Sequence, residues 1–160
     1  MTMRKLFHFD SSSAHYIADA VVLCCFDHRI QQVTRKFLKR REILQPDWII
    51  VAGGAKTLAS PNNDFEKDFI LEQIRMSIRL HRTRRVVLTV HSDCATYGGL
   101  AVYGGNRQAE SDHHLQELDR AAKVVRASFP DVEIVTYFID FEGVWQESVS
   151  ADKNPLPPAD

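Results

Sequence analysis

Cysteine, long apolar stretches and net charge are all scarce in this chain of 160 residues, and each scarcity excludes a class of protein. The three cysteines cannot all pair within one chain, and two are adjacent, which indicates reduced thiols rather than a disulfide scaffold. No apolar run approaches the ~20 residues of a membrane span, so we expect no membrane partner. Twenty basic and twenty-one acidic side chains give a net charge of −1, which leaves no broad basic surface for nucleic acid.

Residues 1–13 also lack the apolar segment and the cleavage site of a secretory signal. Together with reduced thiols, this predicts a cytoplasmic protein, in which cysteines more often bind metal or take part in catalysis than form structural bridges. The remaining composition, 44% hydrophobic and 26% charged, is that of a soluble globular protein.

Apolar segments of two lengths alternate along the chain and predict its fold. Short β-branched runs indicate buried strands at 21–26, 48–52, 86–90 and 132–139. Segments with helical periodicity lie between them, at 31–44, at 64–81 and from Ser111 or Asp112 to 129. Together they predict an α/β fold with a mainly parallel central sheet of about four strands, open to one further edge strand and flanked by helices. We expect a single domain over residues 1–149 and a Pro-rich tail at 150–160.

Two strand ends carry the side chains of chemical interest. Cys25, Asp27 and Arg29 alternate after the first strand, so all three would share one face if the chain stayed extended there. His91 and Cys94, spaced H-x-x-C, directly follow the third strand. The binding crevice of a parallel α/β sheet lies outside the carboxyl ends of its strands. The two groups are therefore expected to form one site.

Cys25, His91 and Cys94 together offer two thiolates and one imidazole, a donor set that zinc accepts. Three protein ligands and one water are the arrangement of a catalytic zinc ion, so we predict Zn²⁺ as the cofactor. Each residue alone is better explained by burial in the core, and only the set at two strand ends favours zinc. Cys24 is expected to point to the opposite face and to belong to the core. Asp27 remains as the only good candidate for a fourth protein ligand.

The polar residues beside these ligands each allow two interpretations. Asp27 with Arg29 is either a plain surface ion pair or a pair that keeps the carboxylate ionised, so that it can accept a hydrogen bond from a zinc-bound hydroxide. Asp93 is either a partner of the site or a cap of its loop. His28 titrates near neutrality and could relay protons, although such a side chain more often points away from the site.

Two further segments are left with simpler interpretations. His113 and His114 are expected in the first turn of a helix, exposed to solvent. The Gly-rich loop at 97–106 is either a flexible wall of the cleft or an interface loop, and its residues favour neither.

The pattern C-x-D-x-R followed by H-x-x-C, on successive α/β units, resembles the β-class carbonic anhydrases. The similarity extends from about Val21 to Trp145 and includes a closing strand followed by glycine. It implies a zinc lyase that hydrates carbon dioxide, a small-molecule substrate, reversibly to bicarbonate by means of a zinc-bound hydroxide. It further implies a homodimer or a higher even oligomer, with the active-site cleft close to the dimer interface.

The resemblance assigns roles residue by residue. Cys25, His91 and Cys94 would be the zinc ligands. Asp27 and Arg29 would be the catalytic dyad that orients the hydroxide, and in a closed form Asp27 would take the fourth zinc position.

Several surroundings depart from the family pattern. His28 stands where the family usually has serine, Ala95 where it has glycine, and Val51-Ala52 where an Arg-Asn pair is common. One alternative is therefore the same zinc machinery acting on carbonyl sulfide or carbon disulfide. Another is a non-catalytic zinc-binding interaction protein, in which Asp27 closes the site permanently.

Overall fold

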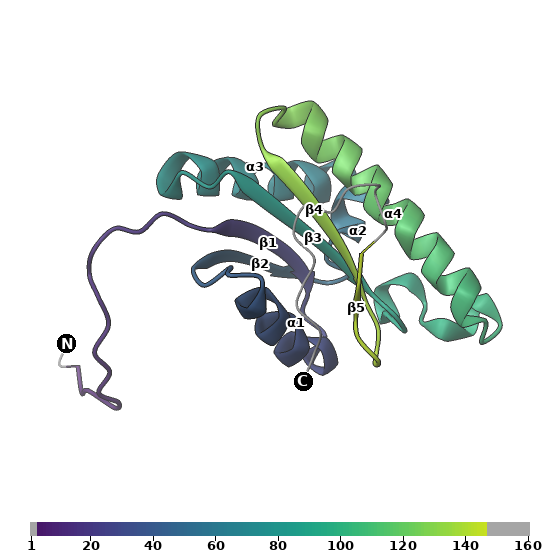
Figure 1. Ribbon diagram of the computed structural model, residues 1–160, viewed down its shortest axis with the longest axis horizontal. Helices are drawn as coiled ribbons and strands as arrows, with labels where there is room; N and C mark the ends of the chain where they lie inside the picture. Colours follow the sequence, from purple (N-terminus) through teal and green to yellow (C-terminus); the bar gives the residue numbers. More distant parts are fainter. Residues whose placement is uncertain (1–2, 147–160) are drawn as a thin grey trace.

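The computed structural model describes residues 3–146, and a single five-stranded sheet forms its centre (Figure 1). The strands are β1 (Ala20–Cys25), β2 (Pro46–Val51), β3 (Arg85–His91), β4 (Glu133–Ile139) and β5 (Val144–Trp145). The helices are α1 (His28–Arg40), α2 (Lys56–Ala59), α3 (Asp64–His81) and α4 (Arg107–Ser128). The sheet order is β2-β1-β3-β4-β5, and only β5 pairs antiparallel to its neighbour. The predicted α/β class with a mainly parallel sheet is confirmed.

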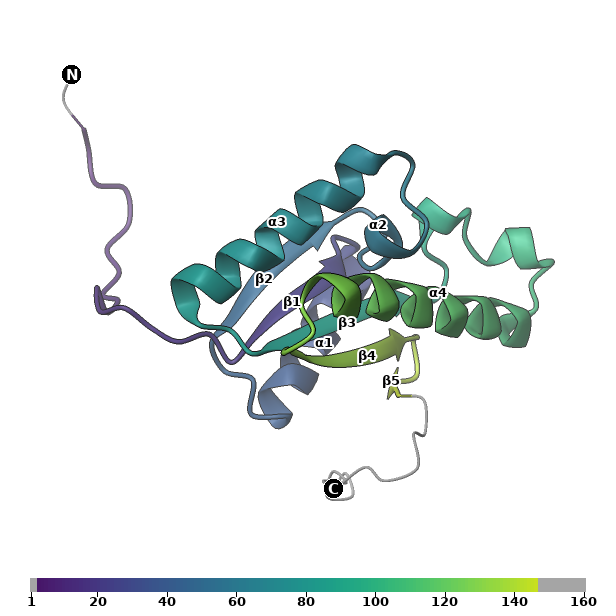
Figure 2. The ribbon, with the colours of Figure 1, turned by 90° about the horizontal axis from the view of Figure 1, so that it is seen from above.

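Alternation of side chains along the strands divides the core into two layers. Val21 packs in one layer with Ile74 of α3 and Leu118 of α4. Its neighbour Val22 packs in the other layer with Leu38 of α1. Accordingly α2, α3 and α4 cover one face of the sheet and α1 covers the other (Figure 2).

The chain reverses its direction of travel across the sheet at β1. From β1 it adds β2 on one side and then returns to place β3 on the other side. The carboxyl ends of β1 and β3 are therefore neighbours, although Cys25 and His91 are far apart in the sequence. Such a reversal is where α/β sheets place their binding crevices.

The first helix begins earlier than its periodicity predicted. It was expected over 31–44 but starts at His28 and ends at Arg40. The Asp27 carboxylate accepts a hydrogen bond from the backbone N–H of Arg29 (3.0 Å) and so caps the helix. The chain is therefore not extended through Arg29, and the expected alternation of three side chains on one strand face is wrong.

The last helix also begins earlier, at Arg107 instead of Ser111 or Asp112. Asn106 is its N-cap, because its side-chain oxygen accepts from the backbone N–H of Ala109 (3.1 Å). Serine and aspartate are good N-cap residues in general, so composition alone favoured the wrong start.

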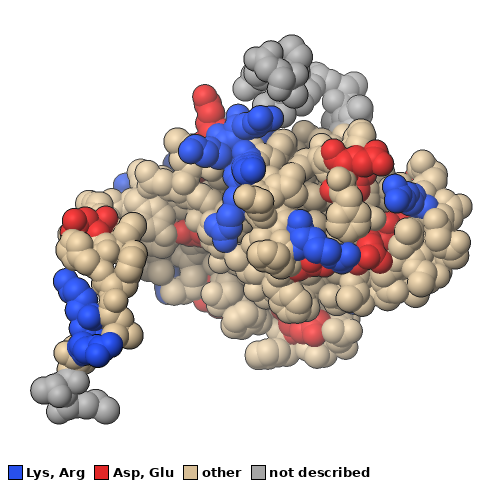
Figure 3. Space-filling view, turned by 90° about the horizontal axis from the view of Figure 1, so that it is seen from below, with Lys and Arg blue, Asp and Glu red and all other residues tan. Residues whose placement is uncertain are grey.

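Residues 3–19 form neither helix nor strand, and they extend away from the sheet (Figures 1 and 2). The segment is attached near its end, where Tyr16 donates a hydrogen bond to Asp47 (2.7 Å). Basic and acidic side chains are interspersed over the face of the molecule shown in Figure 3. No helix within residues 3–146 combines the length and apolar character needed to cross a bilayer. The Pro-rich tail predicted at 150–160 lies outside the described residues.

Candidate metal centre

The structure brings Cys25, His91 and Cys94 together at the carboxyl ends of β1 and β3. All three are buried, and one ligand atom from each lies within 4.8 Å of the other two. In a tetrahedral zinc site with Zn–S distances of about 2.3 Å, two sulfur ligands lie about 3.8 Å apart. The three ligand atoms are therefore close enough together to hold one divalent ion.

His91 presents the free ring nitrogen that a metal ligand needs. Its Nδ1–H donates to the backbone carbonyl of Ser92 (2.8 Å), which sets the tautomer and leaves a lone pair on Nε2. Nε2 is buried and has no hydrogen-bond partner among residues 3–146. Burial by itself would lower the pKa of His91, but the neighbouring Cys94 outweighs burial and raises it. A cation beside this nitrogen is thus favoured by its surroundings.

The two thiols differ in acidity because they lie against each other. A hydrogen bond from Cys25, reinforced by His91, holds the pKa of Cys94 well below its usual range. The same contact, together with burial, raises the pKa of Cys25 far above its usual range. The backbone N–H of Gly53 donates to the Cys25 sulfur (3.3 Å). Thiols lose their protons when they bind a metal ion, and the low pKa of Cys94 favours that loss.

Asp27 and Arg29 form a close pair at the edge of this cluster, as expected, although the helix turn and not a strand face joins them. The Arg29 guanidinium donates to both carboxylate oxygens through Nε (3.1 Å) and Nη2 (2.7 Å). These bonds lower the pKa of Asp27 to about 2. Asp27 Oδ2 lies 4.0 Å from Nε2 of His91. The carboxylate is therefore ionised and adjacent to the place where an ion would bind.

Asp93 has both of the roles that were left open. Its Oδ2 accepts from Nη1 of Arg29 (2.9 Å), and its backbone carbonyl accepts from Nη2 (3.0 Å). Its Oδ1 accepts from the backbone N–H of Leu100 (3.0 Å), which closes the loop after β3. Asp93 is thus both a partner of the Asp27–Arg29 pair and a loop cap.

The other histidines and Cys24 lie outside the cluster. Cys24 is fully buried and 3.7 Å from the Gln31 amide, in agreement with its assignment to the core. His28 is the exposed first residue of α1. His114 was expected in solvent but is fully buried. Because α4 starts at Arg107, this residue lies two turns into the helix, on the face that packs on the sheet.

Two buried carboxylates on α4, Glu110 and Glu117, were missed at the sequence level. Each is only 1% exposed. They share with His114 and Ala121 one stripe of the helix, at intervals of three and four residues. The sequence did contain a signal for them, because acidic residues occupy a helix stripe that otherwise faces the core. The helix was expected to start at Ser111 or Asp112, so Glu110 was not placed on that stripe.

Comparison with known proteins agrees with this geometry. The family model described as "Putative carbonic anhydrase" matches residues 17–149. The chain belongs to this family. Among curated relatives of this carbonic anhydrase family member, an uncharacterized protein of Rickettsia bellii is 23% identical over 134 residues, which is 81% of each chain.

Solved structures show the same fold as this family member. The β-carbonic anhydrase isoform I of Trichomonas vaginalis has a TM-score of 0.53 at 12% identity, over 87% of each chain. The carbonic anhydrase of Glaciozyma antarctica has a TM-score of 0.53 at 16% identity, over 82% of this chain and 83% of that one. At these identities the likeness establishes the fold of a divergent, β-carbonic-anhydrase-like protein.

Proposed function

We propose that this carbonic anhydrase family member is a zinc lyase that hydrates carbon dioxide reversibly to bicarbonate. The observation that carries the proposal is the unpartnered Nε2 of His91, which lies within 4.8 Å of both thiol sulfurs. Cys25, His91 and Cys94 would hold the ion, which fits their soft donor set and the convergence of their ligand atoms. A zinc ion there would supply a hydroxide nucleophile at neutral pH by making a water molecule more acidic.

The chain's own residues orient the reactants. Asp27 stays ionised at every working pH, so it can accept a hydrogen bond but cannot donate one. Asp27 Oδ2 lies 4.0 Å from His91 Nε2, and this oxygen would orient the attacking water. Arg29 holds the carboxylate by three side-chain hydrogen bonds and is itself held by Asp93. Apolar Ile30 and Ile139 pack beside the thiols and limit access of bulk water.

The substitution Asp27→Asn tests this assignment. An amide cannot reproduce the charged acceptor or its bonds to Arg29, so we expect kcat/KM for carbon dioxide hydration to fall about 10- to 100-fold, with zinc content unchanged. Stopped-flow hydration assays and elemental analysis measure the two quantities. Glu133→Gln is the matched control, because Glu133 also pairs with an arginine, Arg85, but on the exposed surface. Absence of hydration by zinc-loaded wild-type protein would reject the proposal.

The substrate is decided by the same assay with carbonyl sulfide and carbon disulfide in place of carbon dioxide. Faster turnover of either sulfur compound would assign the machinery to that substrate.

A non-catalytic zinc protein is the second candidate, and the 4.0 Å approach of Asp27 Oδ2 to His91 Nε2 favours it. A carboxylate so near the cluster needs little movement to become the fourth ligand. Metal-site structures at high and low pH distinguish the two. Asp27 bound to zinc at both pH values supports the non-catalytic protein, and a water in that position at high pH supports the enzyme.

We further propose a cytoplasmic homodimer or a higher even oligomer. The three free, buried cysteines are consistent with a reducing compartment. The apolar side chains of the N-terminal segment support association, because Leu6, Phe7 and Phe9 are 75–81% exposed.

A further inference from the structure

Of the two residues between His91 and Cys94, Asp93 has an unusual backbone conformation. Asp93 has a φ of 54°, in the left-handed region that is uncommon for residues other than glycine, although aspartate is one of the types that adopt it. The loop connects two of the three residues that would hold the ion, so its shape sets their spacing. The spacing of His91 and Cys94 therefore depends on contacts that hold Ser92 and Asp93 in place.

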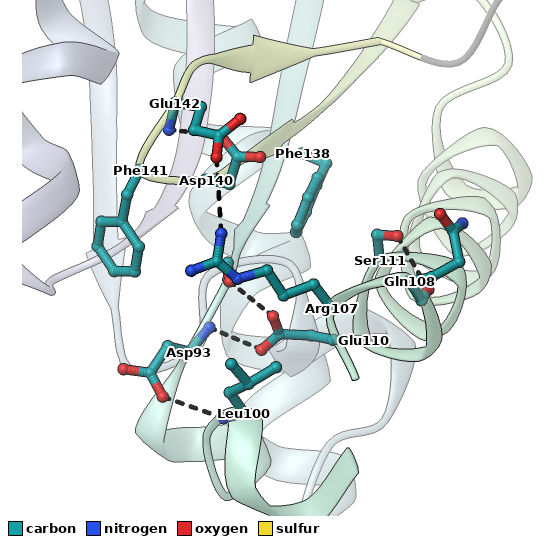
Figure 4. Close-up of a pocket in the computed structure, with 11 residues that line it drawn as sticks. Asp93, Leu100, Arg107, Gln108, Glu110, Ser111, Phe138, Asp140, Phe141 and Glu142 are labelled. Atoms are coloured by element: carbon teal, nitrogen blue, oxygen red, sulfur yellow. Dashed lines mark hydrogen bonds and ion pairs between the residues drawn. The ribbon is translucent and has the colours of Figure 1, made fainter. Parts of the chain in front are cut away.

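Glu110 holds both of them. One carboxylate oxygen accepts from the Ser92 hydroxyl (2.6 Å), and the other accepts from the backbone N–H of Asp93 (2.7 Å). Figure 4 shows Glu110 reaching from α4 to Asp93, and both residues line a cavity of about 550 Å³. A carboxylate that is 99% removed from solvent is unfavourable unless such bonds compensate for the lost hydration. Both oxygens of Glu110 are thus committed to the loop.

The loop in turn contacts both parts of the site. The Ser92 carbonyl accepts the Nδ1–H of His91 and so aims Nε2 at the thiols. The Asp93 carboxylate and carbonyl accept from Arg29, which holds Asp27. Hydrogen bonds therefore connect Glu110 to His91 through Ser92, and to the Asp27–Arg29 pair through Asp93.

We propose that Glu110 is a positioning residue, which through Ser92 and Asp93 orients His91 for metal binding and fixes the Asp27–Arg29 pair. This rests on the proposed zinc function. The family's metal pattern contains no residue of α4, so the assignment comes from these contacts alone.

Zinc affinity tests the proposal without reference to turnover. Glu110→Ala removes both acceptors, and we expect the zinc Kd, measured by competition with a chromogenic chelator, to rise about 10- to 100-fold. The visible absorption of the Co²⁺-substituted protein should change as well, because the ligand geometry changes. Glu110→Gln should restore the affinity to within a few-fold of wild type, since the amide oxygen can accept from Asp93 and the Ser92 hydroxyl can turn to accept from the amide.

Glu117→Ala is the matched control. Glu117 lies on the same stripe of α4, is equally buried, and accepts from Ser60, Tyr97 and Arg120 instead of from Ser92 and Asp93. We expect it to lose folding stability but to keep the zinc Kd and the cobalt spectrum. Equal losses of zinc affinity in the two alanine variants would show a general packing effect and overturn the proposal, as would an unchanged Kd in Glu110→Ala.

A second variant covers the case in which Glu110→Ala does not fold. Ser92→Ala removes one of the two bonds and leaves the Ser92 carbonyl in place, so the zinc Kd should rise by about 3- to 10-fold, less than the loss of both bonds. An unchanged Kd in that variant overturns the proposal. Wild-type protein that binds no zinc would instead reject the proposed function, so the two failures are distinguishable.

Discussion

The two buried histidines, His91 and His114, differ in the hydrogen bonds that their ring nitrogens make. His91 donates from Nδ1 and keeps Nε2 free beside two sulfurs. His114 makes no hydrogen bond at either nitrogen among residues 3–146, and it stacks on Phe138 with ring centroids 5.6 Å apart. His91 Nε2 converges with two sulfurs, whereas the carboxylate nearest to His114, that of Glu110, is committed to Ser92 and Asp93. His114 is instead a neutral core residue, and this has a consequence for stability.

Burial lowers the pKa of His114 to about 4 from 6.5, against a partial opposing effect of Glu110 at 3.9 Å. The other titratable groups near it are His113, Cys94 and His91. Between pH 6.5 and pH 4 the unfolded chain binds more protons than the folded protein, so stability falls as the pH is lowered. From pH 7.5 to pH 5 the loss from this group should be about 2 kcal/mol.

Urea unfolding at pH 7.5 and pH 5 measures this loss. His114→Phe keeps an aromatic ring against Phe138 and removes the titration, so its stability should depend less on pH by about 2 kcal/mol. Both proteins are measured with the same chelator, so that release of metal in acid does not contribute. Equal pH dependence of the two proteins would show that His114 is not responsible.

The turn after β2 lies tightly against β1 and delivers a backbone N–H to Cys25. Gly54 has a φ of +55°, and a Cβ there would lie 2.7 Å from the Thr89 carbonyl oxygen and 2.8 Å from the Cys25 backbone nitrogen. Both neighbours are backbone atoms of central strands, which cannot move aside without disturbing the sheet. The glycine is therefore needed for a close approach as well as for its backbone conformation.

Gly54→Ala should lower the free energy of unfolding by about 3 kcal/mol or more, because strain in the left-handed region adds to the steric clash. Gly105→Ala is the control, since Gly105 also has a positive φ (+78°) but no atom within 4 Å of the added Cβ. It should cost only about 1–2 kcal/mol, from backbone strain alone. Denaturant unfolding measures both variants, and equal losses would exclude the clash.

At the scale of the whole molecule, the N-terminal segment carries apolar side chains that no element within residues 3–146 covers. Met3, Leu6, Phe7 and Phe9 are each at least 75% exposed, on a segment that extends away from the sheet (Figure 2). Burying such side chains in an interface would contribute about 1.5–3 kcal/mol each. A second copy of the chain is the partner that the proposed dimer supplies.

Replacing Leu6, Phe7 and Phe9 together by serine should weaken self-association at least tenfold, as sedimentation equilibrium would show. The control replaces Ser11, Ser12 and Ser13 by alanine in the same segment and should leave the dissociation constant unchanged. Both changes lie before Tyr16, whose hydrogen bond to Asp47 stays intact. A dimer unaffected by the serine variant would place the interface elsewhere.

The sequence by itself determined the sheet and the place of the cysteine–histidine cluster. Runs such as Val21–Leu23 and Val86–Val90 are apolar on both faces and alternate with helices, which is typical of a parallel sheet between helix layers. Since parallel strands end at one edge, Cys25 and His91 could be expected to meet there. These conclusions depend on local pattern and chain connectivity, both of which can be read along the chain.

Only the tertiary structure decided how the cluster is supported. The cap at Asp27 placed Arg29 in a helix, and the cap at Asn106 placed Glu110 and His114 on the buried stripe of α4. Several residue types compete for each cap, and the local sequence does not say which one the packed helix uses. The partners of Glu110 lie 17 and 18 residues away, beyond the reach of any local pattern. Such contacts exist only after α4 has packed on the sheet, because packing brings a buried carboxylate to the loop after β3.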